Sequence, residues 1–220
     1  ANTWGVDIQH EKPEDAGGAW AYQPPLKCLQ DLDQLVIPSF EYDAKATQER
    51  AERVQEVLGD IVPVRVVGGA PLGATLGTAA ADLRGLSEIM MDMIAEPELM
   101  HRLMAHIRDA CLQAMDQVEA AEQITPNHYG PMTLSDPLLP DDGGITWKHC
   151  WCSANSQEFD QVSPAMWEEF LLEYQKPIFE HFGAVAYGCC ENLTTKIDGV
   201  LSIRVRRQGD PGARGAGTGG

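Results

Sequence analysis

Residues 163–188 decide the fold and read SPAMWEEFLLEYQKPIFEHFGAVAYG. Ser163 is suited to cap a helix that starts at Pro164, and the acidic first turn favours the positive end of that helix. The apolar spacing predicts that the helix runs to about Phe182 and ends at Gly183. Residues 184–188 are then short and apolar, which is typical of a strand.

Helices and strands also alternate in the flanking sequence. Upstream we expect a helix over 43–58, a buried strand over 61–67, a loop to residue 79, helices over 86–95 and 97–118, a loop over 124–144 and a strand over 145–152. Downstream, Asn192 should cap a last helix that reaches about Leu201. This alternation predicts an α/β fold with a parallel sheet covered by helices. Its three or four units are too few for a closed eight-stranded barrel.

The helix over 97–118 has the clearest pattern. Its apolar residues recur at helical spacing on one face: Met100, Leu103, Met104, Ile107, Cys111, Ala114, Met115 and Val118. A coiled coil is one reading of such a stripe. About three heptads without a repeated partner sequence favour a single helix packed on a core.

Composition and charge exclude several function classes. The chain has 220 residues, 44% of them hydrophobic, which suits one domain or two small ones. Its formal net charge of −17 disfavours nucleic acids and anionic membranes as main partners, since both are bound by clustered cations. The sequence contains no run of 18 or more apolar residues, so it predicts no membrane-spanning helix. The nucleotide-binding, serine hydrolase and H-E-x-x-H metalloprotease signatures are absent.

Cysteine usage indicates the compartment. The six cysteines are Cys28, Cys111, Cys150, Cys152, Cys189 and Cys190. An adjacent pair and a C-x-C pair make a poor disulfide framework, and the first residues lack a secretory signal. We therefore expect a reducing, cytoplasmic location in which thiols are free to react or to bind metal.

The last 17 residues, 204–220, differ sharply in composition from the rest of the chain. They contain six glycines and four arginines and have too few apolar side chains to bury a core face. We expect a folded domain over 1–203 and a disordered Gly/Arg-rich tail over 204–220. The abrupt change suggests a truncated chain with a foreign or out-of-frame end.

The strongest candidate site follows the strand expected at 184–188. Cys189, Cys190 and Glu191 would lie at the carboxyl end of that strand, where parallel α/β folds build their sites. Two thiols and a carboxylate are plausible zinc ligands. The alternative is that both cysteines are buried apolar residues at a tight turn. Since neighbouring residues in a strand face opposite ways, only one thiol should face the site.

A second candidate lies between residues 147 and 160. In a strand over 145–152, Trp147, His149 and Trp151 would share one face and form an aromatic wall for a planar ligand, or simply a core. The polar run that follows would expose donors and acceptors to a ligand, or form a solvated connection. The candidate substrate-binding residues are Trp147, His149, Asn155, Gln157, Asp160 and Tyr187.

Several segments, in order along the chain, resemble the uroporphyrinogen decarboxylase-like superfamily over about residues 29–203. They are Asp31–Leu35 leading to Pro38, Leu83–Met90, Glu96–Met104, and Asp160–Phe170 with Tyr174 and Pro177. Residues 187–192 fall where the corrinoid methyltransferases of this superfamily carry an H-x-C-G-N zinc motif.

The resemblance implies a TIM (β/α)8 barrel, here an incomplete one, and one of two activities on a tetrapyrrole. One is zinc-dependent methyl transfer between a corrinoid and a thiol. The other is decarboxylation of uroporphyrinogen without a cofactor. If Asn192 is aligned with the asparagine of the H-x-C-G-N motif, Cys190 takes the position of the ligand cysteine and Gly188 that of the histidine. If Cys189 is aligned with the ligand cysteine instead, Tyr187 takes the histidine position. The later cysteine ligand would lie beyond residue 203, so weak zinc binding is expected.

Charge favours the methyltransferase reading. A site for uroporphyrinogen should present clustered arginines to its carboxylates, and the R-Q-A-G-R motif of the decarboxylases is absent. The periphery of cobalamin is mostly neutral amide, which suits Asn155 and Gln157. The expected partner is a tetrapyrrole or a corrinoid protein. The alternatives are a uroporphyrinogen decarboxylase and an inactive truncated fragment.

Overall fold

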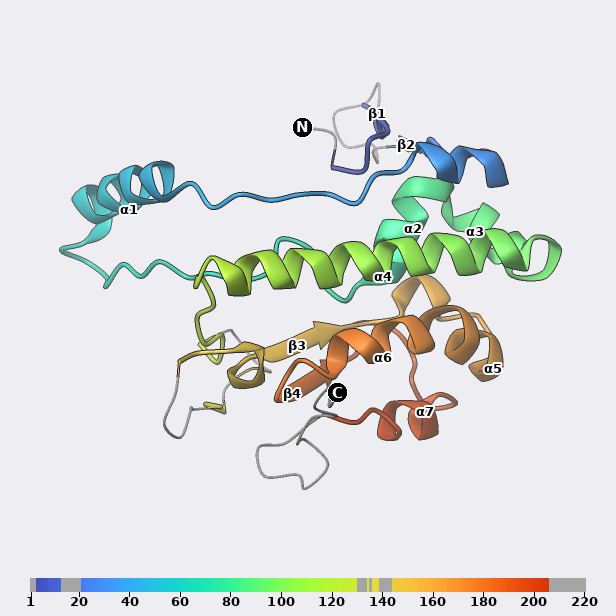
Figure 1. The fold of residues 1–220 in the computed structure, drawn as a ribbon. Helices are drawn as coiled ribbons and strands as arrows, with labels where there is room; N and C mark the ends of the chain where they lie inside the picture. Colours follow the sequence, from blue (N-terminus) through green and yellow to red (C-terminus); the bar gives the residue numbers. More distant parts are fainter. Residues whose placement is uncertain (1–2, 13–20, 130–133, 135, 139–143, 206–220) are drawn as a thin grey trace, which may run out of the picture.

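The computed structural model describes residues 3–12, 21–129, 134, 136–138 and 144–205 (Figure 1). Residues 206–220 of the expected tail lie outside the described residues. The elements in chain order are β1 (Gln9–Glu11), β2 (Ala21–Gln23), η1 (Leu29–Gln34), α1 (Ala44–Leu58), α2 (Leu76–Arg84), α3 (Leu86–Ala95), α4 (Pro97–Ala120), η2 (Trp147–His149), β3 (Trp151–Ala154), η3 (Gln157–Phe159), α5 (Pro164–Trp167), η4 (Glu168–Leu172), α6 (Glu173–Phe179), β4 (Ala184–Tyr187) and α7 (Ile197–Leu201).

The expected α/β order is present in the second half of the chain. β3 and β4 pair in parallel, with Trp151 opposite Ala184 and Ala154 opposite Tyr187. The helical crossover from α5 through η4 to α6 joins them, and Ser163 caps it by accepting a hydrogen bond from the Met166 N–H. Within the described residues the strands form two two-stranded sheets and close no barrel.

α4 is the central helix of the core and lies along α6 (Figure 1). Every residue of its predicted stripe is buried except Val118, which is half-buried. The crossover contributes large buried side chains to the same core, among them Trp167, Phe170 and Phe179. The single packed helix is therefore confirmed, and its stability comes from this buried face.

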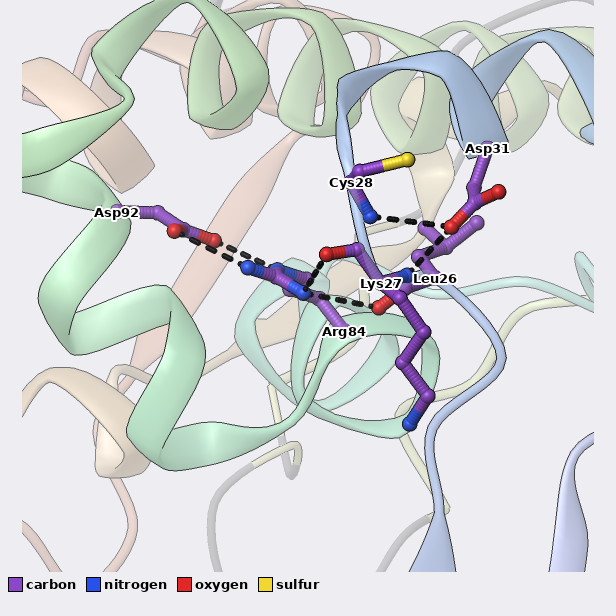
Figure 2. Close-up of polar contacts among 6 residues, drawn as sticks. All are labelled: Leu26, Lys27, Cys28, Asp31, Arg84 and Asp92. Atoms are coloured by element: carbon purple, nitrogen blue, oxygen red, sulfur yellow. Dashed lines mark hydrogen bonds and ion pairs between the residues drawn. The ribbon is translucent and has the colours of Figure 1, made fainter.

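A half-buried arginine, Arg84, fastens the N-terminal segment to the helices (Figure 2). The Arg84 guanidinium donates to both carboxylate oxygens of Asp92, at 2.7 and 3.2 Å. It also donates to the carbonyl oxygens of Leu26 and Lys27, at 3.0 and 2.9 Å. The bond to Asp92 raises the pKa of Arg84. Because the guanidinium keeps its charge and has several donors, it can hold three partners at once.

The prediction of a strand over 61–67 is wrong. The segment pairs with no other strand of the described residues, and Ile61 and Val67 are 72% and 67% exposed. A strand needs a neighbour for its backbone N–H and C=O groups, and among the described residues the ladder partner is missing here. Directly after the segment, the Gly68 N–H donates to Thr125 Oγ1 at 2.9 Å.

Three further boundaries differ from the sequence-based expectation. The loop predicted to residue 79 ends earlier, because α2 begins at Leu76. The strand predicted over 145–152 begins with a 3₁₀ turn, in which the Thr146 N–H donates to His149 Nδ1 at 2.9 Å, so the predicted alternation of faces is wrong. Asn192 does not cap the last helix; its Oδ1 accepts from the Thr194 N–H.

α1 confirms the helix predicted over 43–58 but contributes nothing to the core. Asp43 caps it by accepting from the Ala46 N–H at 2.8 Å, and Gly59 follows its last residue. None of its residues is buried, and it projects from one end of the molecule (Figure 1). Among the described residues, no helix is both long enough and apolar enough to cross a membrane.

Candidate active site at the carboxyl ends of the parallel strands

Two loops follow the carboxyl ends of β3 and β4 and are bonded to each other. The Ser156 N–H and hydroxyl donate to Glu191 Oε1 at 2.7 and 3.2 Å. The Asn192 N–H donates to Asp160 Oδ1 at 2.8 Å. Bonds to backbone and neighbouring donors also lower the pKa of Asp160. These carboxylates join the loop over 155–163 to the loop over 188–196.

A buried lysine adds a third link. Lys196 is 1% exposed, and its ammonium donates to the carbonyl oxygens of Phe159 and Asp160, at 2.6 and 3.2 Å. Desolvation lowers its pKa, and the negative charges of Asp160 and Glu191 oppose that effect. A charge so deeply buried is tolerated only when its donors are bonded, so Lys196 fixes the distance between the two loops.

A chain of hydrogen bonds lies beneath the loops. Trp167 Nε1 donates to the Tyr187 hydroxyl at 3.1 Å, and that hydroxyl donates to Gln175 Oε1 at 2.9 Å. The fully buried Gln175 amide then donates to the carbonyl oxygens of Ala74 and Asn155. Burial raises the pKa of Tyr187 to about 12, so the hydroxyl stays protonated and remains a donor.

Two thiols occupy the end of β4. Cys189 and Cys190 are both exposed, and their sulfur atoms are 3.5 Å apart. Gly188 makes the turn before them with a φ of +111°, a region that favours glycine. The contact with the Cys190 thiol raises the pKa of Cys189. Both thiols lie on the surface, in contrast to the alternative that they are core residues.

Glu191 holds this thiol loop in place. Its Oε2 accepts from the Cys189 N–H at 2.9 Å, while Oε1 accepts from Ser156. Burial acts to raise the pKa of Glu191, but the N–H groups around its carboxylate outweigh that effect and lower it. Both oxygens are already engaged, so this carboxylate is placed to position the thiols.

The thiols fit a zinc ion as two of its ligands. Two sulfurs bound to one tetrahedral zinc at about 2.3 Å lie about 3.8 Å apart, close to the observed 3.5 Å. Among the described residues, however, no group of three or more His, Cys, Asp or Glu side chains could hold a metal ion. The zinc site expected at Cys190, Cys189 and Glu191 therefore remains a prediction, and a third protein ligand is not in place within the part of the chain that the structure describes.

Four of the six expected substrate-binding residues gather at this end of the sheet. Asn155, Gln157 and Asp160 lie in or beside η3, and Tyr187 ends β4. Gln157 is exposed, whereas Asp160 and Tyr187 already bond to protein groups. Asn155 Oδ1 is buried and has no hydrogen-bond partner within the described residues.

The other two residues, Trp147 and His149, precede β3 and lie at its amino end. Both are buried. Trp147 Nε1 donates to the Met115 carbonyl at 3.2 Å, and its ring packs against Phe182 at 5.5 Å between centroids. Trp147 borders a cavity of about 250 Å³ together with Cys150 and Cys152. The structure thus separates these two residues from the thiol loop.

Sequence reasoning missed three residues of this site, Ser156, Gln175 and Lys196, whereas Glu158 belongs to the polar run that was expected to form a binding loop. Gln175 had a detectable signal, since it follows Leu171 by four residues and precedes Ile178 by three on a buried face. Glu158 accepts from the Thr78 hydroxyl at 2.7 Å through Oε1, and its buried Oε2 has no partner among the described residues. No local pattern marked the buried Lys196.

Comparison with known proteins places the chain in a family. The family model described as Uroporphyrinogen decarboxylase (URO-D) matches residues 3–125, which is more than half of the chain. The matched region ends before β3. A protein from Aliivibrio salmonicida (strain LFI1238) named uroporphyrinogen decarboxylase is 23% identical over 133 residues, which cover 54% of this chain and 38% of that protein. The chain thus spans well under half of that relative. No solved structure matches significantly. The chain belongs to the uroporphyrinogen decarboxylase family.

Proposed function

We propose that residues 1–203 form part of a (β/α)8 barrel, and that the loops over 155–163 and 188–196 lie at its mouth and bind a tetrapyrrole. Membership of the family supports the barrel. The parallel pair with its helical crossover supports it as well, because this is the repeating unit of such barrels. The tail from residue 204 would lie outside that domain.

The chemistry proposed for this mouth is zinc-dependent methyl transfer between a corrinoid and a thiol. The observation that carries it is the exposed pair Cys189 and Cys190, with sulfurs 3.5 Å apart at the end of a parallel strand. Zinc held by this pair would bind the substrate thiol and favour its thiolate form near neutral pH. Glu191 would keep the two sulfurs together through its bond to the Cys189 N–H.

Two acceptors in the segment that follows β3 support a ligand rich in amide donors. Asn155 Oδ1 and Glu158 Oε2 are buried without partners in the described part of the chain. A buried acceptor without a donor costs about 1–3 kcal/mol, which a ligand N–H would recover. The amide side chains at the edge of a corrinoid provide such donors.

Decarboxylation of uroporphyrinogen is the second candidate, favoured by the name of the matched relative. Four of the six arginines before residue 204 are engaged elsewhere, and the other two, Arg50 and Arg53, lie on the exposed helix α1. Arg84 binds Asp92, Arg102 binds Asp33, and Arg108 binds Asp109. Arg65 stacks over Tyr129 at 4.0 Å. The methyl-transfer proposal needs no such cluster.

Parallel assays separate the candidates. The protein would be supplied with zinc, methylcobalamin and a small thiol in one series, and with uroporphyrinogen in the other. We expect zinc-dependent demethylation of methylcobalamin by the wild type, and a rate at least roughly 10–100-fold lower in Cys190→Ser. Loss of a residue that only supports a metal ligand already costs that much, so loss of a ligand should cost no less. Cys28→Ser is the matched control, because Cys28 is also exposed but distant in sequence. Formation of coproporphyrinogen without zinc would contradict the proposal and support the second candidate. If the protein shows neither activity, the chain is an inactive fragment.

A further inference from the structure

The six thiols fall into three kinds of environment. Cys111, Cys150 and Cys152 are buried, and burial raises their pKa values to about 12, 11 and 12. Cys28 is exposed, and no other cysteine is bonded to it in the described residues. Cys189 and Cys190 alone among the described cysteines form an exposed pair with a direct sulfur–sulfur contact. We propose that this pair is a two-thiol chelating site for monosubstituted trivalent arsenicals.

The distance between the two sulfur atoms determines which coordination geometry a shared bound atom can have. With the sulfurs 3.5 Å apart and each about 2.3 Å from a shared atom, the angle at that atom is about 100°. A linear two-coordinate ion does not fit this angle. A tetrahedral ion such as zinc also fits the angle, but its two further ligands would have to come from outside the described residues. A pyramidal arsenic carrying one organic group is complete with two sulfurs.

The surroundings hold both sulfurs ready for such a ligand. The Cys189 N–H is bonded to Glu191, and Glu191 is bonded to Ser156 across the loops. The positive φ of Gly188 fixes the turn that carries the pair to the surface. Pre-organisation of this kind lowers the entropy lost on binding. The site does not depend on the proposed methyl transfer, because it uses no zinc and no corrinoid.

The binding reaction is a condensation without oxidation. An arsenic–oxygen double bond is replaced by two arsenic–sulfur bonds, one to Cys189 and one to Cys190. Both thiol protons leave with the oxygen as one molecule of water. Arsenic stays trivalent throughout, so no oxidant or reductant is required.

Titration with phenylarsine oxide tests the proposal, with intact mass as the readout. We expect one phenylarsenic group per wild-type chain, removable by a dithiol. Cys189→Ser and Cys190→Ser should each bind roughly 10²–10⁴-fold more weakly, since either change abolishes the intramolecular second bond. Cys28→Ser should bind like the wild type. Wild-type affinity in either paired variant, or loss of binding in Cys28→Ser, would overturn the assignment.

A second measurement needs no variant. Phenylarsine oxide bound to the wild type should protect Cys189 and Cys190 together from alkylation by iodoacetamide, while Cys28 is alkylated at its usual rate. Peptide mass mapping would read this directly. Alkylation of either paired cysteine in the saturated complex would contradict the chelate.

Discussion

The Tyr187 hydroxyl connects the crossover helix to the site, because it accepts from Trp167 and donates to the buried Gln175. Tyr187→Phe would leave both partners unsatisfied, at a cost of about 1–3 kcal/mol in the free energy of unfolding. Urea denaturation measures this cost. Tyr42→Phe, at a tyrosine that is 47% exposed, should change stability by less than about 0.5 kcal/mol. Equal effects of the two changes would show that the hydrogen-bond chain carries no stability.

Glu191 should make the site sensitive to acid. Its pKa is lowered in the folded state, so its contribution to stability is present above its ordinary value of 4.5 and is lost as the pH falls through the folded value. Glu191→Gln should destabilise the protein by about 1–2 kcal/mol near neutral pH. The difference from the wild type should shrink at acidic pH. A difference that stays constant down to acidic pH would contradict this role. Glu56→Gln, on the exposed face of α1, is the control.

At the scale of elements, the Arg84–Asp92 pair holds the segment before η1 against α2 and α3. The two side chains are 12% and 6% exposed. Asp92→Asn would leave the half-buried Arg84 guanidinium without its counter-charge, which costs up to about 3 kcal/mol. Arg102–Asp33 is an exposed pair, at 44% and 73%, and Asp33→Asn should cost less than about 1 kcal/mol. Thermal unfolding would compare the stability of the two variants. A larger loss of stability in Asp33→Asn than in Asp92→Asn would contradict the role given to the Arg84–Asp92 pair.

Elements with local signals were predictable from the sequence. The stripe of α4, the Ser163–Pro164 start of the crossover and the helix over 43–58 all depend on spacing within a few residues. The segment over 61–67 failed because its apolar residues form a strand only if a distant neighbour pairs with it. Likewise, the links from Ser156 to Glu191 and from Lys196 to Phe159 span 35 and 37 residues, and no local spacing predicts them.

At the scale of the whole molecule, the described residues include large apolar side chains that are exposed, as the proposed incomplete barrel predicts. Val57, Ile61 and Val67 are each more than 65% exposed, on α1 or just after it. Surfaces of this kind favour association, so we expect residues 1–203 to be poorly folded or self-associated. Sedimentation velocity across a concentration series would detect this. A monomer with one sharp, cooperative unfolding transition would contradict the incomplete-barrel account.

Zinc titration under reducing conditions tests the central proposal, the metal site at the mouth, most directly. The wild type, Cys189→Ser, Cys190→Ser and Cys28→Ser would be compared by calorimetry. We predict weak binding of one zinc ion to the wild type and to Cys28→Ser, and loss of binding in Cys190→Ser. Equal affinity in all four proteins would contradict the site, and loss in Cys189→Ser alone would assign the ligand to the other thiol.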